Sequence, residues 1–234
     1  MYIHLVDAKN ISHYGREIEA MHRARKAMFV DRLGWADLST QSDLEIDEFD
    51  HEYCSYFLLL SKTGQLLGSC RLTPTHKPNV TTDKLANFFD GSPPTSDSVY
   101  EVSRWIPAPG IKELNKQCNL MMMLGLFEFG HKAKASMMIS CVGRVVTSAI
   151  ARAGVPISKI YMPQRYKEGI ASGIEFIPSW ENVLLLRESF EIPHCVVQYH
   201  EFGPQDNSEI IAPIVPAFMS QGPSSSETNK SIVK

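Results

Sequence analysis

The chain has 234 residues, 44% of them hydrophobic, with 23 Lys and Arg against 26 Asp and Glu and a formal net charge of −3 at pH 7. A chain of this length and apolar content can bury a large core, which excludes a disordered protein and favours one globular domain over two small ones. The sequence contains no apolar stretch near the roughly 20 residues that cross a bilayer and no nucleic-acid motif, so we expect neither membrane insertion nor a nucleic-acid partner.

Hydrophobic periodicity and turn residues predict alternating helices and strands. In chain order the pattern predicts a strand over 2–6, a helix over 14–33, an acidic loop over 36–53, a β-hairpin over 56–74, a strand over 99–107 ended by Pro107, a helix over 113–134, a strand over 136–142, a helix over 143–153, a strand over 157–162, and strands near 183–188 and 195–201. This order predicts an α/β (α+β) fold, a mixed sheet between helices around one core. We expect it to span residues 1–202, whereas Pro, Ser, Gln and Asn dominate 203–234 and indicate a flexible tail.

The N-terminus and the cysteines bear on the cellular compartment. The opening residues MYIHLVDA lack the basic and apolar regions of a secretory signal, so we expect a soluble protein that no standard signal exports. The cysteines are odd in number and form no Cys-x-x-Cys pair; they are Cys54, Cys70, Cys118, Cys141 and Cys195. We interpret them as free thiols in a reducing cytoplasm.

The charges are unevenly distributed along the chain. Six acidic residues crowd the segment 43–52, whereas residues 129–167 contain seven Lys or Arg and no Asp or Glu. This separation favours two surfaces with different partners, one that attracts a cation and one that attracts an anion. Chance clustering on solvated faces is the alternative.

Three residues near the first predicted helix can hold one ligand. Arg25 and Phe29 are four apart and share a helix face, and Trp35 follows just beyond the helix end. A guanidinium binds carboxylate or phosphate through two hydrogen bonds, and aromatic faces stack on a purine or contact a cation. The alternative is a surface arginine beside two core aromatic residues.

The acidic loop contains a pair of carboxylates with a regular spacing. Asp47 and Asp50 lie three apart in EIDEFD, so in a turn or short helix both side chains face the same way. Paired carboxylates suit an ammonium, a sulfonium or a hard metal ion, but the glycine and the ligand spacing of an EF-hand are missing. A solvated acidic loop is the alternative.

Charged residues also occur in two predicted strands. Arg71 lies near the end of the second hairpin strand, and Glu101 and Arg104 lie in YEVSRW. Residues three apart in a regular strand point to opposite faces, so Glu101 and Arg104 can serve one cleft only if a β-bulge re-aims the chain between them. We predict that bulge. The alternative is an edge-strand ion pair, worth about 0 to 1 kcal/mol when exposed.

Taken together, these positions resemble the acyl-homoserine lactone synthases, the autoinducer synthases of bacterial quorum sensing. The matching residues are Arg25, Phe29, Trp35, Asp47, Asp50, Arg71, Glu101 and Arg104. The resemblance covers about residues 1–165 and is close in FVDRLGW, DEFD, CRLTP and EVSR. Each motif is common by itself, but eight positions in register are specific and outweigh the alternatives given above.

The resemblance implies an enzyme. Members of this family transfer an acyl group from acyl carrier protein, or in some members from coenzyme A, to the amine of S-adenosylmethionine; the product closes to a lactone and methylthioadenosine leaves. It also implies a fold similar to the GNAT acyltransferases, no cofactor and no metal, because S-adenosylmethionine is a substrate. The implied partners are therefore S-adenosylmethionine and acyl-acyl carrier protein or acyl-CoA.

The resemblance also implies roles for the site residues. Those that form or order the S-adenosylmethionine pocket are Arg25, Phe29, Trp35, Asp47, Asp50, Arg71 and Arg104, and those we place at the catalytic centre are Glu101, Ser103 and Arg104. Glu101 is our candidate for the general base, since a free α-amino group has a pKa of about 7.7 to 8.0 and needs only modest help to lose its proton. We expect backbone N–H groups where two strands splay to stabilise the oxyanion.

The acyl chain needs an apolar slot, which we expect between the long helix, the strand after it and the following helix. Our candidates are Ser103, Trp105, Met123, Leu126, Ser140, Val142 and Val146. Core packing explains any single methionine equally well. At the position that matches Ser140, relatives preferring 3-oxo chains often carry threonine, so serine leaves that preference undecided.

The resemblance also implies an anionic partner for the segment 129–167, which contains no Asp or Glu. Acyl carrier protein is strongly acidic and would be steered to such a surface, where we expect Arg144, Arg152 and Lys159 to dock it. Coenzyme A is also polyanionic, so the basic surface does not distinguish the two donors.

Other functions and sites compete with this interpretation. An ordinary GNAT-type N-acyltransferase acting on another small amine would share the fold, but its Gln/Arg-x-x-Gly-x-Gly/Ala phosphate loop is absent after VSRW. A module that binds S-adenosylmethionine without turning it over would use the same acidic loop. A zinc site would draw on residues that lack regular ligand spacing, namely His51, Cys54, His194 and Cys195.

Overall fold

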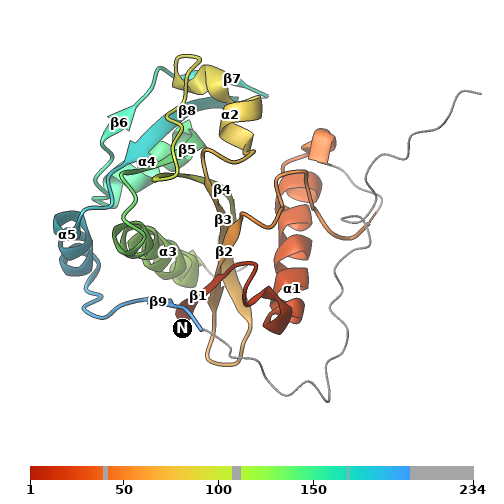
Figure 1. Ribbon diagram of the computed structural model, residues 1–234, viewed down its shortest axis with the longest axis vertical. Coiled ribbons are helices and arrows are strands. Elements are labelled where there is room, and N and C mark those ends of the chain that lie inside the picture. Colours follow the sequence, from red (N-terminus) through yellow and green to blue (C-terminus); the bar gives the residue numbers. More distant parts are fainter. Residues whose placement is uncertain (39–41, 107–111, 168, 201–234) are drawn as a thin grey trace, which may run out of the picture. The chain divides into compact units, whose positions relative to one another are not determined.

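One mixed sheet runs through the part of the chain that the structure describes. The computed structural model describes residues 1–38, 42–106, 112–167 and 169–200, which lie in one compact unit. Within these residues nine strands form a sheet of order β6-β8-β5-β4-β3-β2-β1-β9, with β7 paired to β8 (Figure 1). The strands are β1 (Tyr2–Val6), β2 (Ser55–Leu60), β3 (Leu66–Pro74), β4 (Val99–Ile106), β5 (Met137–Gly143), β6 (Lys159–Ile160), β7 (Gln164–Tyr166), β8 (Gly169–Phe176) and β9 (Val197–Gln198). Strands β4 and β5 pair in parallel, as do β1 and β9.

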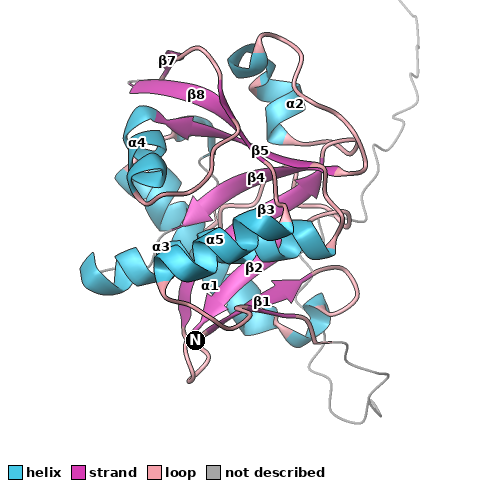
Figure 2. Ribbon diagram, turned by 90° about the vertical axis from the view of Figure 1, so that its left-hand side faces the viewer, coloured by secondary structure: helices cyan, strands magenta, loops and turns pink. Residues whose placement is uncertain are grey.

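Helices cover both faces of this sheet (Figure 1, Figure 2). The longer helices are α1 (Gly15–Arg25), α3 (Lys112–Lys132), α4 (Arg144–Arg152) and α5 (Trp180–Phe190), and the shorter elements are η1 (Ile11–His13), the π-helical η2 (Lys26–Arg32), η3 (Ala36–Leu38), α2 (Val80–Lys84) and η4 (Ala86–Phe89). Helix α1 lies on one face, while α3, α4 and α5 lie on the other. No helix among the described residues is long and apolar enough to cross a membrane.

The main core lies between the sheet and α3. Alternate residues of the central strands, such as Phe57 and Leu59 on β2, point to this face and are fully buried. Burial of each such side chain contributes about 1.5 to 3 kcal/mol. A Cβ atom at Gly125 would lie 2.3 Å from the side chain of Ile3, so glycine at this position lets α3 lie close to β1. A second cluster, which includes Met21 and Leu58, fixes α1 to the opposite face.

The predicted fold class is confirmed, and most predicted elements are observed. The helix predicted over 14–33 is α1 followed by the π-helical turn, and the hairpin turns at Gly64, whose φ of 79° is left-handed. The predicted strand over 157–162 is shortened to Lys159–Ile160. The tail predicted over 203–234 and the strand end at Pro107 lie outside the described residues.

The strand predicted near 183–188 is wrong, because this segment belongs to helix α5. Ser179 caps the helix by accepting a hydrogen bond from the backbone N–H of Asn182. Val183 and Leu186 are buried and three apart, which is the spacing of a helix face, whereas Leu184 and Leu185 are exposed. An apolar run of this length has no period that separates a strand from a helix.

Among the α-helices and strands, the prediction also lacks α2, β7 and β8. Strand β8 has the sequence GIASGIEF, whose small residues are unfavourable in strands. Gly173 is needed here because a Cβ atom would lie 2.5 Å from the backbone oxygen of Phe88. Tertiary contact with η4 therefore selects a glycine that weakens the strand pattern in the sequence.

Candidate active site

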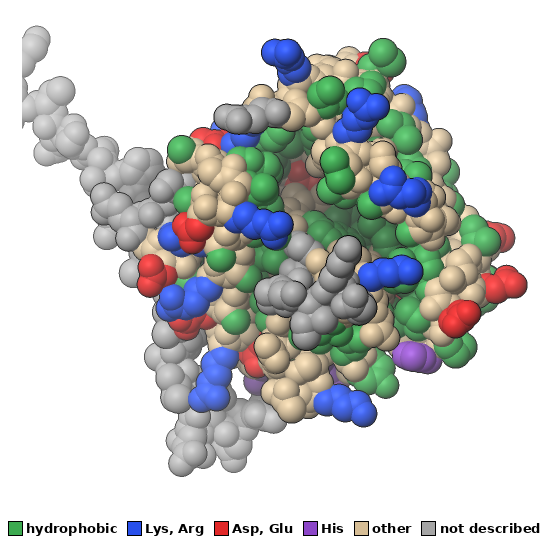
Figure 3. Space-filling model, turned by 180° about the vertical axis from the view of Figure 1, so that it is seen from behind, with side chains coloured by type: hydrophobic (Ala, Val, Ile, Leu, Met, Phe, Trp, Pro, Cys, Tyr) green, Lys and Arg blue, Asp and Glu red, His purple; other side chains and the backbone are tan. Residues whose placement is uncertain are grey.

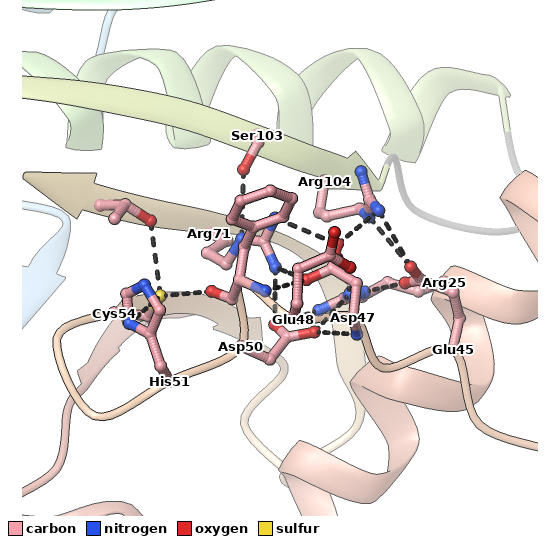
Figure 4. A network of polar contacts seen from close by, with 12 residues as sticks. Arg25, Glu45, Asp47, Glu48, Asp50, His51, Cys54, Arg71, Ser103 and Arg104 are labelled. Atoms are coloured by element: carbon pink, nitrogen blue, oxygen red, sulfur yellow. Dashed lines mark hydrogen bonds and ion pairs between the residues drawn. The ribbon is translucent and has the colours of Figure 1, made fainter. Parts of the chain in front are cut away.

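A buried network of ion pairs joins the end of α1 to the acidic loop. The Arg25 side chain is fully buried, and its two terminal nitrogens donate hydrogen bonds of 2.8 Å to the two carboxylate oxygens of Asp50 (Figure 4). Its Nε donates to Glu45. Burial would lower the pKa of Arg25, but the charges of Asp50 and Glu45 raise it above its usual value. Burial would raise the pKa of Asp50, yet Arg25 and Arg71 hold it well below its usual value.

Two arginines from adjacent strands complete the network. Arg71 on β3 contacts Asp47 at 2.5 Å and Asp50 at 2.9 Å, and Arg104 on β4 contacts Asp47 at 2.5 Å and Glu45 at 3.1 Å (Figure 4). The three arginines are balanced by three carboxylates in the same buried cluster. Asp47 and Asp50 therefore neutralise arginines and order the site, and their oxygens are already occupied by these partners.

The acidic loop folds so that its carboxylates face these arginines. Asp47 Oδ1 accepts a hydrogen bond from the backbone N–H of Phe49, and Asp50 Oδ2 accepts one from that of Asp47, each at 2.9 Å. The buried Phe49 ring lies beside the Arg71 guanidinium, 5.9 Å from its carbon atom. His22 on α1 donates to the carbonyl oxygen of Glu45 at 2.8 Å. These contacts explain why EIDEFD forms an ordered turn rather than a solvated loop.

The predicted β-bulge is present in β4, but it lies between Ser103 and Ile106, at the end of the predicted interval from Glu101 to Arg104. Arg71 pairs with Ser103 and Ser69 pairs with Ile106, so β4 has one residue more than β3 in this interval. Arg104 has a φ of 53°, a left-handed conformation that is uncommon outside glycine. In a regular strand Arg104 would point away from the face that carries Ser103, and the bulge turns it back toward Asp47.

Glu101 is buried separately from the arginine network. One carboxylate oxygen, Oε1, accepts hydrogen bonds from the backbone N–H and the hydroxyl of Thr81, at 2.7 and 2.8 Å. The other oxygen, Oε2, is buried and has no hydrogen-bond partner among the described residues. A buried acceptor without a partner is rare and costly in folded proteins. Glu101 Oε2 is thus a buried carboxylate oxygen that no hydrogen bond among the described residues satisfies.

Two aromatic side chains lie next to the network. The rings of Phe29 and Trp35 stack with centroids 5.3 Å apart and an interplanar angle of 21°. The Arg104 guanidinium lies over the Phe29 ring at 5.6 Å. The π-helical turn brings the two rings together, because the backbone N–H of Trp35 donates to the carbonyl oxygen of Phe29. Phe29, Trp35 and Arg104 thus form one surface, while Arg25 lies buried behind it.

The strands β4 and β5 splay apart beside Glu101. Their parallel pairing ends at Glu101 and Ile139, after which β4 continues along β3 and β5 continues along β8. The hydroxyl of Ser140 donates to the carbonyl oxygen of Val102 at 2.7 Å where the strands begin to separate. Figure 3 shows a hollow on the back of the molecule, with a largely hydrophobic lining and Lys and Arg around it.

The residues predicted to line an acyl slot divide between the core and the surface. Met123 and Leu126 on α3 are buried in the main core, and Trp105 donates its indole N–H to Asn119 at 2.8 Å. Val142 is half-buried, whereas Val146 is 49% exposed. Ser103 accepts a hydrogen bond from Arg71 Nε, so it belongs to the polar site. The three residues predicted to dock a carrier are exposed on α4 and β6, namely Arg144, Arg152 and Lys159.

Glu45 and Thr81 contact the predicted site residues but are absent from the predicted set. Glu45 bridges Arg25 and Arg104, and Thr81 holds Glu101. Glu45 lies two residues before Asp47 in the motif already noted, so its spacing was available as a signal. The sequence gives no such signal for Thr81, because this residue precedes Glu101 by 20 residues and lies in a segment without a predicted element.

The zinc alternative fails on geometry. Cys54 Sγ lies 3.4 Å from His51 Nδ1 and donates to the carbonyl oxygen of Phe49, while burial raises the pKa of the Cys54 thiol. Cys195 instead donates to Glu128 beside β9. Within the described ranges no three His, Cys, Asp or Glu side chains are grouped so that they could hold a metal ion.

Known proteins match both the fold and the sequence. A solved structure of BjaI, described as a CoA-dependent acyl-homoserine lactone synthase with SAM and isopentyl-CoA, superposes with a TM-score of 0.78 over 86% of this chain and 94% of that chain, at 20% identity. The acyl-homoserine lactone synthase LasI gives a TM-score of 0.65 over 79% of this chain and 92% of that chain, at 21% identity. The acyl-homoserine-lactone synthase of Pseudomonas aeruginosa is 27% identical over 161 residues, 68% of this chain and 78% of the relative.

The described fold is therefore that of the acyl-homoserine lactone synthases. The family model for autoinducer synthases matches residues 10–182, and the chain belongs to this family. The family predicted from eight scattered residues is confirmed, and with it the enzyme class, an acyltransferase.

Proposed function

We propose that this chain acylates the amine of S-adenosylmethionine from a carrier thioester and then closes the product to an acyl-homoserine lactone, with Glu101 as general base. The observation that carries the assignment of Glu101 is its buried, unpartnered Oε2. Glu101 lies on β4, on the same face as Ser103 and beside the point where β4 and β5 separate. Residues 1–202 form the catalytic domain of this proposal.

The surface formed by Phe29, Trp35 and Arg104 suits S-adenosylmethionine. The partly exposed Trp35 ring can contact a purine or a sulfonium, and the Arg104 guanidinium can bind the carboxylate. Ion pairs with Glu45 and Asp47 already fix the orientation of Arg104, so binding of the substrate costs little further ordering of that side chain.

The first step joins the amine nitrogen to the thioester carbon. Glu101 takes the proton, directly or through one water, the tetrahedral oxyanion is stabilised by backbone N–H groups at the strand splay, and the carbon–sulfur bond breaks to release the thiol. In the second step the substrate's own carboxylate oxygen attacks the carbon bonded to the sulfonium. That carbon–sulfur bond breaks and neutral methylthioadenosine leaves, so the closure needs chiefly a folded conformation of the substrate.

A direct assay tests this function. The purified full chain is mixed with S-adenosylmethionine and, in separate reactions, an acyl carrier thioester and an acyl-CoA, and both methylthioadenosine and the lactone are measured by mass spectrometry. We expect equimolar release of the two products with at least one donor. Binding of S-adenosylmethionine without either product would support the non-catalytic module instead.

We propose that Met123 limits the acyl chain, because it lies at the edge of the main core on α3. Met123→Ala should shift the product profile toward longer chains when the enzyme is offered a mixture of acyl donors. Met21→Ala is the control, since it removes another buried methionine, from the α1 cluster. Both should lower the free energy of unfolding by about 2 to 5 kcal/mol, so an unchanged profile in a folded Met123→Ala protein would refute the assignment.

We propose that the donor docks on the exposed basic surface of α4 and β6. The double variant Arg144→Glu/Arg152→Glu should raise the KM for an acyl carrier thioester by roughly tenfold at low ionic strength, because both charges steer an acidic partner. The difference should shrink as salt is added. Lys62→Glu, in the exposed β2–β3 turn, is the control; equal effects of the two changes would argue against a local docking surface.

The proposed compartment is the cytoplasm. All five cysteines are free thiols in the described chain, as expected where disulfides do not persist.

A further inference from the structure

Tyr166 at the end of β7 and Lys167 after it contact the segment that carries Trp35. Tyr166 pairs with Gly169 across the β7–β8 hairpin, and Lys167 has a φ of 50°, which places a non-glycine residue in the left-handed region. Lys167 nonetheless makes well-defined contacts with residues about 130 positions earlier in the sequence. The eight residues of the family motif include none from this hairpin.

Tyr166 extends the aromatic surface of the substrate site. Its half-buried ring meets Trp35 edge-on, with centroids 6.0 Å apart and planes at 87°, and meets Phe88 on η4 in the same way at 5.6 Å and 86°. Phe29 stacks on Trp35 from the other end of the row. The rings of Phe29, Trp35, Tyr166 and Phe88 therefore form a continuous row, here called the aromatic wall, from the π-helical turn to η4. Phe29 and Trp35 belong to the family motif.

Lys167 holds the same tryptophan by its charge. Its Nζ lies 4.5 Å from the centre of the Trp35 ring and 5.8 Å from that of Tyr166, and it forms an ion pair of 2.5 Å with Asp37. Asp37 lies in η3, two residues after Trp35. One lysine thus contacts both the indole ring and the carboxylate of a residue in the same segment.

The hairpin lies close to the arginine network as well. The hydrogen bond from Lys167 lowers the pKa of Asp37, and the positive charge of Arg104 acts in the same direction. Burial raises the pKa of Tyr166, Asp37 and Cys141 raise it further, and Arg104 opposes them. Tyr166 and Asp37 are therefore within electrostatic range of the guanidinium that we assign to the substrate carboxylate.

We propose that Tyr166 and Lys167 are positioning residues for S-adenosylmethionine, which hold Trp35 in its orientation and complete the aromatic wall. This inference rests on the proposed function. A wall of rings beside a guanidinium matches a ligand that carries a purine, a sulfonium and a carboxylate. The proposed function places the donor on α4 and β6, so the two substrates should respond differently when the hairpin is changed.

The test compares Lys167→Ala with the wild-type chain. Loss of the cation over Trp35 and of the ion pair should raise the KM and the calorimetric Kd for S-adenosylmethionine about fivefold to tenfold, with kcat and the KM for the acyl donor unchanged. Lys167→Arg should restore most of the affinity, because a guanidinium can also pair with Asp37 and stack on an indole. Tyr166→Phe should keep the affinity and Tyr166→Ala should lose it.

Lys77→Ala is the control, because it also removes a lysine whose Nζ lies over an aromatic ring, 4.0 Å from the centre of Tyr53, a residue outside the aromatic wall. It should leave both substrate constants unchanged. Wild-type chain that binds S-adenosylmethionine but releases no methylthioadenosine would refute the proposed function and not this inference. Active wild type together with an unchanged Kd in Lys167→Ala, or equal losses in KM for both substrates, would overturn the inference.

Discussion

Glu101→Gln should lower kcat by about 10² to 10⁴ while leaving the affinity for S-adenosylmethionine close to that of the wild type. The glutamine carbonyl oxygen can accept the two hydrogen bonds from Thr81 that Oε1 accepts now, so the local structure is preserved. The amide nitrogen that replaces Oε2 cannot take a proton. Initial rates of methylthioadenosine release and calorimetric binding give the two quantities separately.

The pH profile distinguishes a lost base from a disturbed pocket. A free α-amino group deprotonates in solution with a pKa of about 7.7 to 8.0, so solvent supplies the neutral amine above this range. The ratio of wild-type to Glu101→Gln rates should therefore fall as the pH is raised from 7 toward about 9. A Glu101→Gln rate within threefold of the wild-type rate at pH 7 would remove Glu101 from the mechanism.

Arg71→Ala should abolish product formation and lower the free energy of unfolding by about 3 to 5 kcal/mol. Arg71 is fully buried, and its removal leaves Asp47 and Asp50 with less positive charge in a place that water does not reach. It also removes the hydrogen bond to Ser103. Chemical denaturation followed by circular dichroism measures the stability, and the activity is assayed where the variant is still folded.

Arg23→Ala is the control for this change. Arg23 pairs with Glu19 and Asp43 on the surface of α1, and its side chain is 53% exposed, so its loss should change the free energy of unfolding little and leave the activity intact. If Arg71→Ala were as stable as Arg23→Ala, the buried network would not contribute to the fold in the way its geometry indicates. If the folded variant were fully active, the assignment of Arg71 to the site would be wrong.

Local patterns predicted much of this structure. The β2–β3 hairpin has two largely apolar runs with a glycine in the turn between them, and both signals act over a few residues. The bulge at Arg104 followed from a conflict between the period of a strand and the need for two charged residues in one cleft. Side chains of a regular strand point alternately to two faces. Two residues three apart can therefore share one face only if the strand is irregular.

The failures have a common cause in contacts between distant segments. Strand β8 keeps Gly173 because η4 lies against it, and α5 presents Leu184 and Leu185 to solvent, which blurs its helical face. Tyr166 and Lys167 acquire a role only when the hairpin meets residues near Trp35. Neither local propensity nor periodicity contains information about contacts between segments that are far apart in the sequence.

The ion-pair cluster has a consequence for how the enzyme folds and becomes active. Its partners are separated by 20 residues for Arg25 and Glu45 and by 59 for Arg104 and Glu45, so it can assemble only once α1, β3 and β4 have all come together. A partly folded chain would hold unmatched charges and no binding surface. Synthesis of the signal should consequently begin and stop as a single cooperative event, without a weakly active intermediate form.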